Sequence, residues 1–174
     1  MAKELLEKEL LESLQTACDF ITKSYQEQTG KRVRFEVMQF SDIAKPNSGR
    51  DIVRELAQLY DEYEGNENYI HIPDIAQMAH NLKNYPIISI INEENDEIEG
   101  ATTIKYHHNQ EGNVDPYYPK PGVKSYSITG ILVRQRENIT NKGLGTSMYE
   151  AAILGLQKYA MSHKEENVEI NCVI

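Results

Sequence analysis

The sequence predicts a mixed α/β (α+β) domain in which helices flank a mostly antiparallel sheet. Apolar and polar residues alternate strictly over 32–40, which is typical of a strand with one buried face. Two apolar runs at 87–91 and 98–107, joined by a short polar turn, predict a β-hairpin. Helical periodicity precedes and follows these strands, and the length of 174 residues is typical of one compact unit.

The N-terminal residues 1–30 are predicted to form an amphipathic helix, set before a domain over 31–174. Apolar residues recur at helical spacing, and Thr29-Gly30 gives a helix-stop signal. The stripe consists of Leu6, Leu10, Leu14, Ala17 and Ile21. Such a helix either docks on its own domain or forms a dimer contact, and the pattern leaves both open.

The elements after this helix are expected in the order β-α-α-β-β-β-α-β. Residues 61–68 read as an acidic loop, and 108–123 as a long loop because it contains two glycines and three prolines. The predicted ranges are a strand at 32–40, helices at 49–63 and 73–82, strands at 87–91, 98–107 and 124–133, a helix at 144–163 and a strand at 168–174.

The composition is that of a folded, acidic protein. The chain has 18 lysines and arginines against 27 acidic residues, a formal net charge of −9. Because nucleic-acid binding depends on a basic surface that displaces phosphate counterions, we do not expect a nucleic-acid partner. The acidity would favour a cationic substrate, although it would equally serve solubility alone.

Cysteine usage and hydropathy indicate a cytoplasmic protein. The two cysteines, Cys18 and Cys172, are far apart in the sequence, which argues against a disulfide framework or a zinc ribbon. No apolar run approaches the ~20 residues needed to cross a bilayer, so no membrane partner is expected. The N-terminus alternates charge with leucine and has no apolar signal-peptide core.

The main functional signal is the segment Gly143-Leu144-Gly145-Thr146, where a helix is predicted to begin. Glycines let the backbone approach a ligand closely, and free amides at a helix N-terminus bind phosphate. A P-loop is excluded because no lysine follows Gly145. A dinucleotide fingerprint is excluded because Met148 stands where the third glycine is needed.

Together with the strand Ile131-Leu132-Val133, the stretch 140–146 resembles motif A of the GNAT N-acetyltransferase family. In that family a strand, a pyrophosphate loop of the form Q/R-x-x-G-x-G/A and a helix bind acetyl-coenzyme A. The order of elements over 32–174 is similar too, although Thr140 stands where the family has Gln or Arg. The resemblance implies a GNAT-like sheet with an extra N-terminal helix, and binding of acetyl-CoA by Leu132, Val133, Thr140, Asn141, Lys142, Gly143, Leu144, Gly145 and Thr146.

Two glycines, Gly130 and Gly143, lead to specific expectations. Gly130 lies inside a predicted strand and indicates a β-bulge, a close backbone approach, or a glycine tolerated for packing. In the family, a splay beside this strand admits the pantetheine arm. Gly143→Val is expected to abolish CoA binding with little change in thermal stability, because a side chain would obstruct the pyrophosphate.

The resemblance does not carry over a catalytic residue. Some members place a glutamate base on the fourth strand, about where Ser127 stands, and serine is not a useful base at neutral pH. Tyr126 and His108 are substitutes by position only, and the pattern favours a structural role for each. No metal is expected, because adjacent strand residues such as His107 and His108 point to opposite faces.

Two functions therefore fit the sequence. The first is transfer of an acetyl group from acetyl-CoA to an amine, with a small molecule or a peptide as acceptor. The second is a non-catalytic GNAT-like CoA-binding or regulatory module, which the lack of a strand glutamate favours. The family normally adds a helix and strands after the strand at 168–174, and the resemblance leads us to expect that these C-terminal elements are missing here. We therefore expect further residues, or a second copy in a homodimer, to cover its edge.

Overall fold

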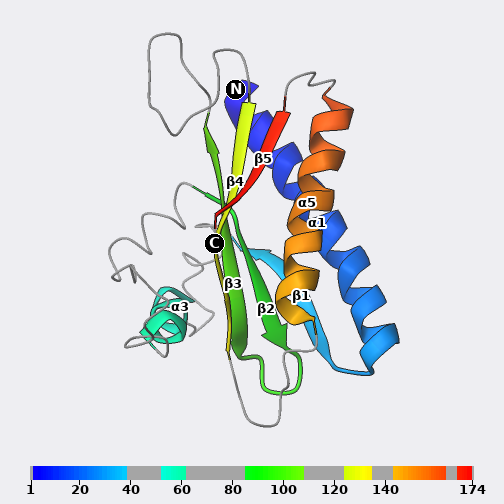
Figure 1. Ribbon diagram of the computed structural model, residues 1–174, viewed down its shortest axis with the longest axis vertical. Helices are drawn as coiled ribbons and strands as arrows, with labels where there is room; N and C mark the ends of the chain where they lie inside the picture. The colour runs from blue at the N-terminus through cyan, green and yellow to red at the C-terminus, as the bar shows by residue number, and fades with distance from the viewer. Residues whose placement is uncertain are drawn as a thin grey trace.

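The computed structural model describes residues 2–38, 52–61, 85–107, 124–134, 143–163 and 168–173. Its helices are α1 (Ala2–Thr29), α3 (Ile52–Asp61) and α5 (Leu144–Ser162). Its strands are β1 (Val33–Met38), β2 (Ile87–Asn92), β3 (Ile98–His107), β4 (Lys124–Val133) and β5 (Val168–Val173). Each of these was predicted within a few residues (Figure 1). The predicted helix at 73–82, most of the acidic loop 61–68 and the loop 108–123 lie outside the described residues.

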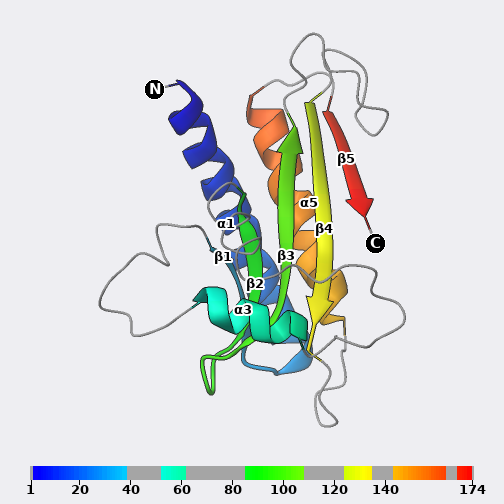
Figure 2. The same cartoon turned by 90° about the vertical axis from the view of Figure 1, so that its left-hand side faces the viewer.

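The five strands form one sheet in the order β1-β2-β3-β4-β5. The first three pairings are antiparallel and the last, between β4 and β5, is parallel. Helix α5 makes the crossover that a parallel pair requires (Figure 2). The predicted mixed, mostly antiparallel sheet is thus confirmed.

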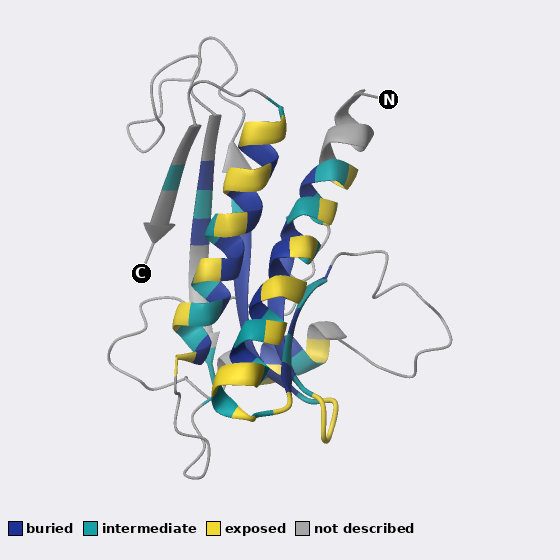
Figure 3. Ribbon diagram, turned by 90° about the vertical axis from the view of Figure 1, so that its right-hand side faces the viewer, coloured by how far each residue is buried: buried dark blue, intermediate teal, exposed yellow. Residues whose placement is uncertain are grey.

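Helices α1 and α5 lie side by side on one face of the sheet, and α3 lies on the other face (Figures 1 and 2). The inward sides of α1 and α5 are buried and their outward sides are exposed (Figure 3). Leu10, Leu14 and Ile21 of α1 join one hydrophobic core with Phe35 of β1 and Met148 of α5. Helix α1 therefore docks on its own chain, which is the first of the two alternatives that its apolar stripe left open. No helix in the described ranges has the length and apolar character to cross a membrane.

The two helices approach closely because α5 has a glycine at the contact. A methyl group at Gly155 would lie 2.7 Å from Cδ2 and 2.8 Å from Cα of Leu14. Such short separations leave no space for any side chain at position 155. Cys18, one helical turn after Leu14, is fully buried in the same core. Its burial, with Asp19 and Glu36 nearby, raises the pKa of the thiol to about 12, so it is a core side chain rather than a nucleophile.

Candidate functional site

Strand β4 contains a β-bulge at Gly130. Ala101 of β3 pairs with Leu132, and Thr103 pairs with Thr129. Two residues of β4, Gly130 and Ile131, therefore lie opposite the single residue Thr102, which is the definition of a bulge. This confirms the first of the three interpretations of Gly130.

The pairing between β4 and β5 stops immediately before this bulge. It runs from Lys124 opposite Val168 to Thr129 opposite Val173. Val173 is also the last residue of β5 that the structure describes. Within the described residues, the last four residues of β4, 130–133, thus have no strand beside them on the β5 side. The pairing of the two parallel strands therefore covers the part of β4 that precedes the bulge.

The backbone of Val133 points away from β3. The Arg134 N–H donates a hydrogen bond of 2.6 Å to the carbonyl of Glu99 at the start of β3, so the peptide groups of residue 134 point toward β3. Peptide groups alternate in direction along an extended strand. The N–H and C=O of Val133 therefore point away from β3, and those of Leu132 point toward β3. The sequence predicted both residues together but could not separate their roles.

Helix α5 begins beside the same end of β4, as both cartoon views show (Figures 1 and 2). Its N-cap is Gly143, in the left-handed conformation with φ of 77°. The first helical hydrogen bond runs from the Ser147 N–H to the Gly143 carbonyl, 2.8 Å. The amides of residues 144–146 precede it and, as in any helix, are not used by the helix itself. The bulge, the outward backbone of Val133 and these amides thus lie at one end of the molecule.

The predicted loop residues differ in what they can offer a ligand. Gly143 is exposed, with no atom near the position of a Cβ, and Thr146 is exposed as well. Leu144 is buried in the core, with 1% of its surface exposed, so its side chain is not available to a ligand. Thr140, Asn141 and Lys142 lie outside the described residues.

The positive φ of Gly143 corrects one expectation. An L side chain at φ of 77° is strained even where space is free, and a β-branched one most of all. Gly143→Val must therefore lower thermal stability, whatever it does to binding. The expectation of nearly intact stability was wrong, because the sequence does not display the backbone conformation.

The two catalytic candidates differ in environment. Tyr126 is only 2% exposed and belongs to the hydrophobic core, where its ring meets Tyr159 edge-on at a centroid distance of 6.5 Å and an interplanar angle of 81°. Ser127, its neighbour on β4, is half-buried on the opposite face. His108 lies outside the described residues. Among the residues that the structure does describe, no group of three or more His, Cys, Asp or Glu side chains is arranged to hold a metal ion.

Comparison with known proteins shows the fold. No protein-family model matches the sequence, and no curated protein does. Among solved structures, an aminoglycoside acetyltransferase from an uncultured soil metagenomic sample, in complex with sisomicin, superposes with a TM-score of 0.50 and 19% identity, over 82% of this chain and 78% of that chain. The same enzyme with trehalose gives a TM-score of 0.51, 18% identity and the same coverage. A ribosomal-protein-alanine N-acetyltransferase from Brucella melitensis covers 80% of this chain and 79% of its own, at 15% identity and a TM-score of 0.47. The chain thus has the GNAT fold.

Proposed function

We propose that the chain is an N-acetyltransferase that takes its acetyl group from acetyl-CoA. The observation that carries the proposal is the N-terminus of α5, which begins at the left-handed Gly143 beside the end of β4 that contains the bulge at Gly130. The extended arm of the cosubstrate would lie along β4 past the bulge, where the N–H and C=O of Val133 point away from β3. The glycine N-cap and the amides after it suit the pyrophosphate at the far end of that cosubstrate.

Different residues of the chain would bind different parts of the cosubstrate. The N–H and C=O of Val133 would bind the amide groups of the pantetheine arm, as a strand would, and thereby orient it. The amides of Leu144, Gly145 and Thr146 would bind the pyrophosphate, with Thr140, Asn141 and Lys142 completing the loop and Lys142 adding positive charge. Acetyl-CoA, when bound, supplies the thioester whose acetyl group is transferred. The contribution of the chain is mainly to position it against the amine.

A cationic amine is the acceptor that the charge of the chain favours. The net charge of −9 raises the local concentration of cations near the surface. The solved aminoglycoside acetyltransferase that shares this fold makes polyamine antibiotics a sensible first panel, and peptides with a free N-terminus a second one. The amine must lose a proton before it attacks the thioester, and the described residues do not provide an obvious base.

Release of the CoA thiol on mixing the protein with acetyl-CoA and each acceptor tests the proposal. Acceptor-dependent release, with acetylated product in the mass spectrum, is the expected result. If CoA binds but neither panel gives turnover, the proposal of catalysis fails and the chain is a non-catalytic CoA-binding module. Turnover by a protein whose melting temperature CoA does not raise would instead contradict the proposed cosubstrate site.

Tyr126→Phe is expected to leave the rate of acetyl transfer within about threefold of the wild-type rate. The buried ring of Tyr126 packs on Tyr159, and the substitution keeps that ring. A general acid or base contributes about 10²–10⁴-fold, so a catalytic hydroxyl would be obvious in steady-state kinetics. Tyr159→Phe is the matched control, since it removes the other hydroxyl of the same pair. A hundredfold loss in Tyr126→Phe alone would show that this tyrosine is catalytic.

A further inference from the structure

Strand β1 forms one outer edge of the sheet, and every second residue turns its backbone outward. The carbonyl of Arg32 accepts a hydrogen bond of 3.0 Å from the Glu93 N–H, so the even-numbered positions face β2. Because peptide groups alternate along a strand, those of Val33, Phe35 and Val37 face away from the sheet. Outward groups of this kind are a template for pairing with another strand.

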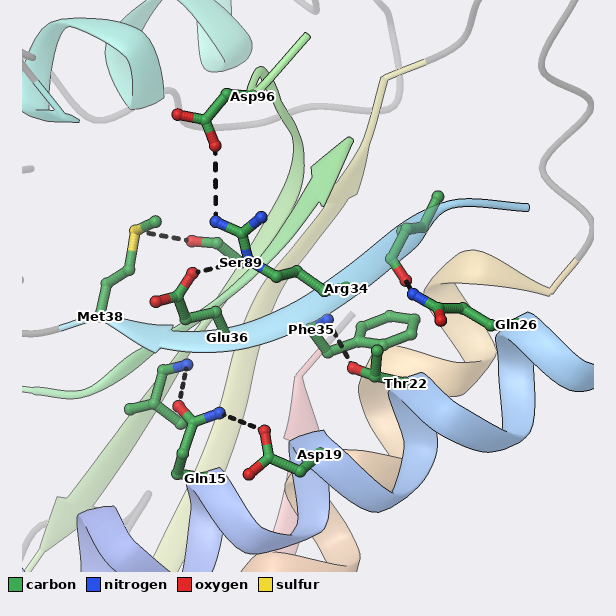
Figure 4. Close-up of polar contacts among 12 residues, drawn as sticks. Gln15, Asp19, Thr22, Gln26, Arg34, Phe35, Glu36, Met38, Ser89 and Asp96 are labelled. Carbon is green, nitrogen blue, oxygen red and sulfur yellow. Dashed lines mark hydrogen bonds and ion pairs between the residues drawn. The ribbon is translucent and has the colours of Figure 1, made fainter. Parts of the chain in front are cut away.

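Side chains of α1 occupy these outward positions (Figure 4). The Gln26 side-chain amide donates to the Val33 carbonyl, 3.0 Å. The Phe35 N–H donates to the Thr22 hydroxyl, 2.8 Å. The Val37 N–H donates to the Gln15 side-chain oxygen, 3.0 Å. Three successive outward residues of β1 are thus each bound by a polar side chain of the helix.

The arrangement is more specific than one helix packing on a strand. Residues 15, 22 and 26 of α1 are seven and four positions apart, so they share one helix face. Gln15 also donates from its side-chain nitrogen to the Asp19 carboxylate, 2.8 Å. That bond directs the Gln15 oxygen toward the Val37 N–H. The nitrogen and the oxygen of the Gln15 side-chain amide are thus both hydrogen-bonded, which fixes its orientation.

We propose that Gln15, Thr22 and Gln26 close the β1 edge against pairing with β1 of a second copy of this chain. Two β1 strands related by a two-fold axis at Phe35 would place Arg34 of each copy opposite Glu36 of the other. Their apolar residues would lie on one face, so the strand is complementary to itself. Helix α1 supplies the hydrogen bonds that such a pairing would otherwise make, and the sheet does not grow at this edge. The inference does not depend on the proposed enzymatic function.

The triple variant Gln15→Ala, Thr22→Val, Gln26→Ala tests the proposal by sedimentation or light scattering. The expected result is concentration-dependent doubling of the wild-type mass, whatever the oligomeric state of the wild type. The matched control is Thr16→Val with Gln28→Ala, because the hydrogen bonds of these side chains stay within α1. Control and wild type should have equal masses at every concentration. A triple variant that keeps the wild-type mass over a hundredfold concentration range overturns the proposal.

If the triple variant does not fold, amide hydrogen exchange in the wild type and in single variants tests the proposal instead. In Thr22→Val alone, the Phe35 amide should exchange about tenfold faster than in wild type, the effect of one lost hydrogen bond, and in Thr16→Val it should not change. In the wild type, the Phe35 and Val37 amides should be protected although β1 is an edge strand. Exchange of both at the rate of unprotected amides would show that α1 does not close the edge, and would refute the proposal.

Discussion

Gly155→Val is expected to lower the free energy of unfolding by about 3 kcal/mol, the upper end for an overpacked core. Even a methyl group at this position would lie 2.8 Å from the Cα of Leu14, which is backbone and cannot rotate away. Helix α1 would have to move off α5, and the core that both helices share would lose contacts along its length.

Leu154→Val is the control for the substitution at Gly155. Leu154 precedes Gly155 on the same helix and is exposed, so its replacement introduces the same β-branched residue without a clash. It should cost less than about 1 kcal/mol, the range of helix propensity alone. Urea unfolding followed by circular dichroism measures both variants. Equal losses would mean that α1 and α5 do not approach each other as closely as described.

Gly143→Val is expected to abolish the stabilisation of the protein by CoA. A ligand that binds only the folded state raises the melting temperature, and a variant without affinity loses that rise. The valine would project into the open space beside the N-cap of α5, where the pyrophosphate is proposed to bind. The strain of the left-handed conformation should also cost about 1–2 kcal/mol without any ligand.

Gly30→Val separates the strain from the effect on binding. Gly30 has φ of 70°, also has no atom near the position of a Cβ, and follows α1 instead of preceding α5. The two variants should lose similar stability in the absence of ligand, and Gly30→Val should keep the full CoA-induced rise in melting temperature. A CoA-induced rise in Gly143→Val as large as in Gly30→Val would contradict the proposed role of the loop.

Local patterns made most of the fold predictable. The alternation around Val33, Phe35 and Val37 requires a strand with one buried face, and the periodicity of residues 6–21 requires an amphipathic helix. Gly130 marked the bulge because a glycine inside a strand has no side chain to contribute to packing. These features depend only on neighbouring residues, so the sequence contains them directly.

Features that depend on register or on a distant partner were not predictable. The division of roles between Leu132 and Val133 follows from the pairing of β4 with β3, which no spacing in β4 alone reveals. Gln15, Thr22 and Gln26 resemble an ordinary solvated helix face, and only the position of α1 beside β1 gives them hydrogen-bond partners. Nothing in the pattern of α1 specified which surface of the domain its apolar stripe would cover.

Titration calorimetry of the wild-type protein with acetyl-CoA and with CoA tests the central claim most directly. The bulge at Gly130, the outward backbone of Val133 and the N-terminus of α5 predict saturable binding of one molecule of either ligand per chain. Both ligands should bind, because the groups proposed to hold them contact the pantetheine and pyrophosphate that the two share. Absence of measurable heat from both ligands at millimolar concentration would contradict the claim, and the bulge would then be a feature of the fold without a cosubstrate.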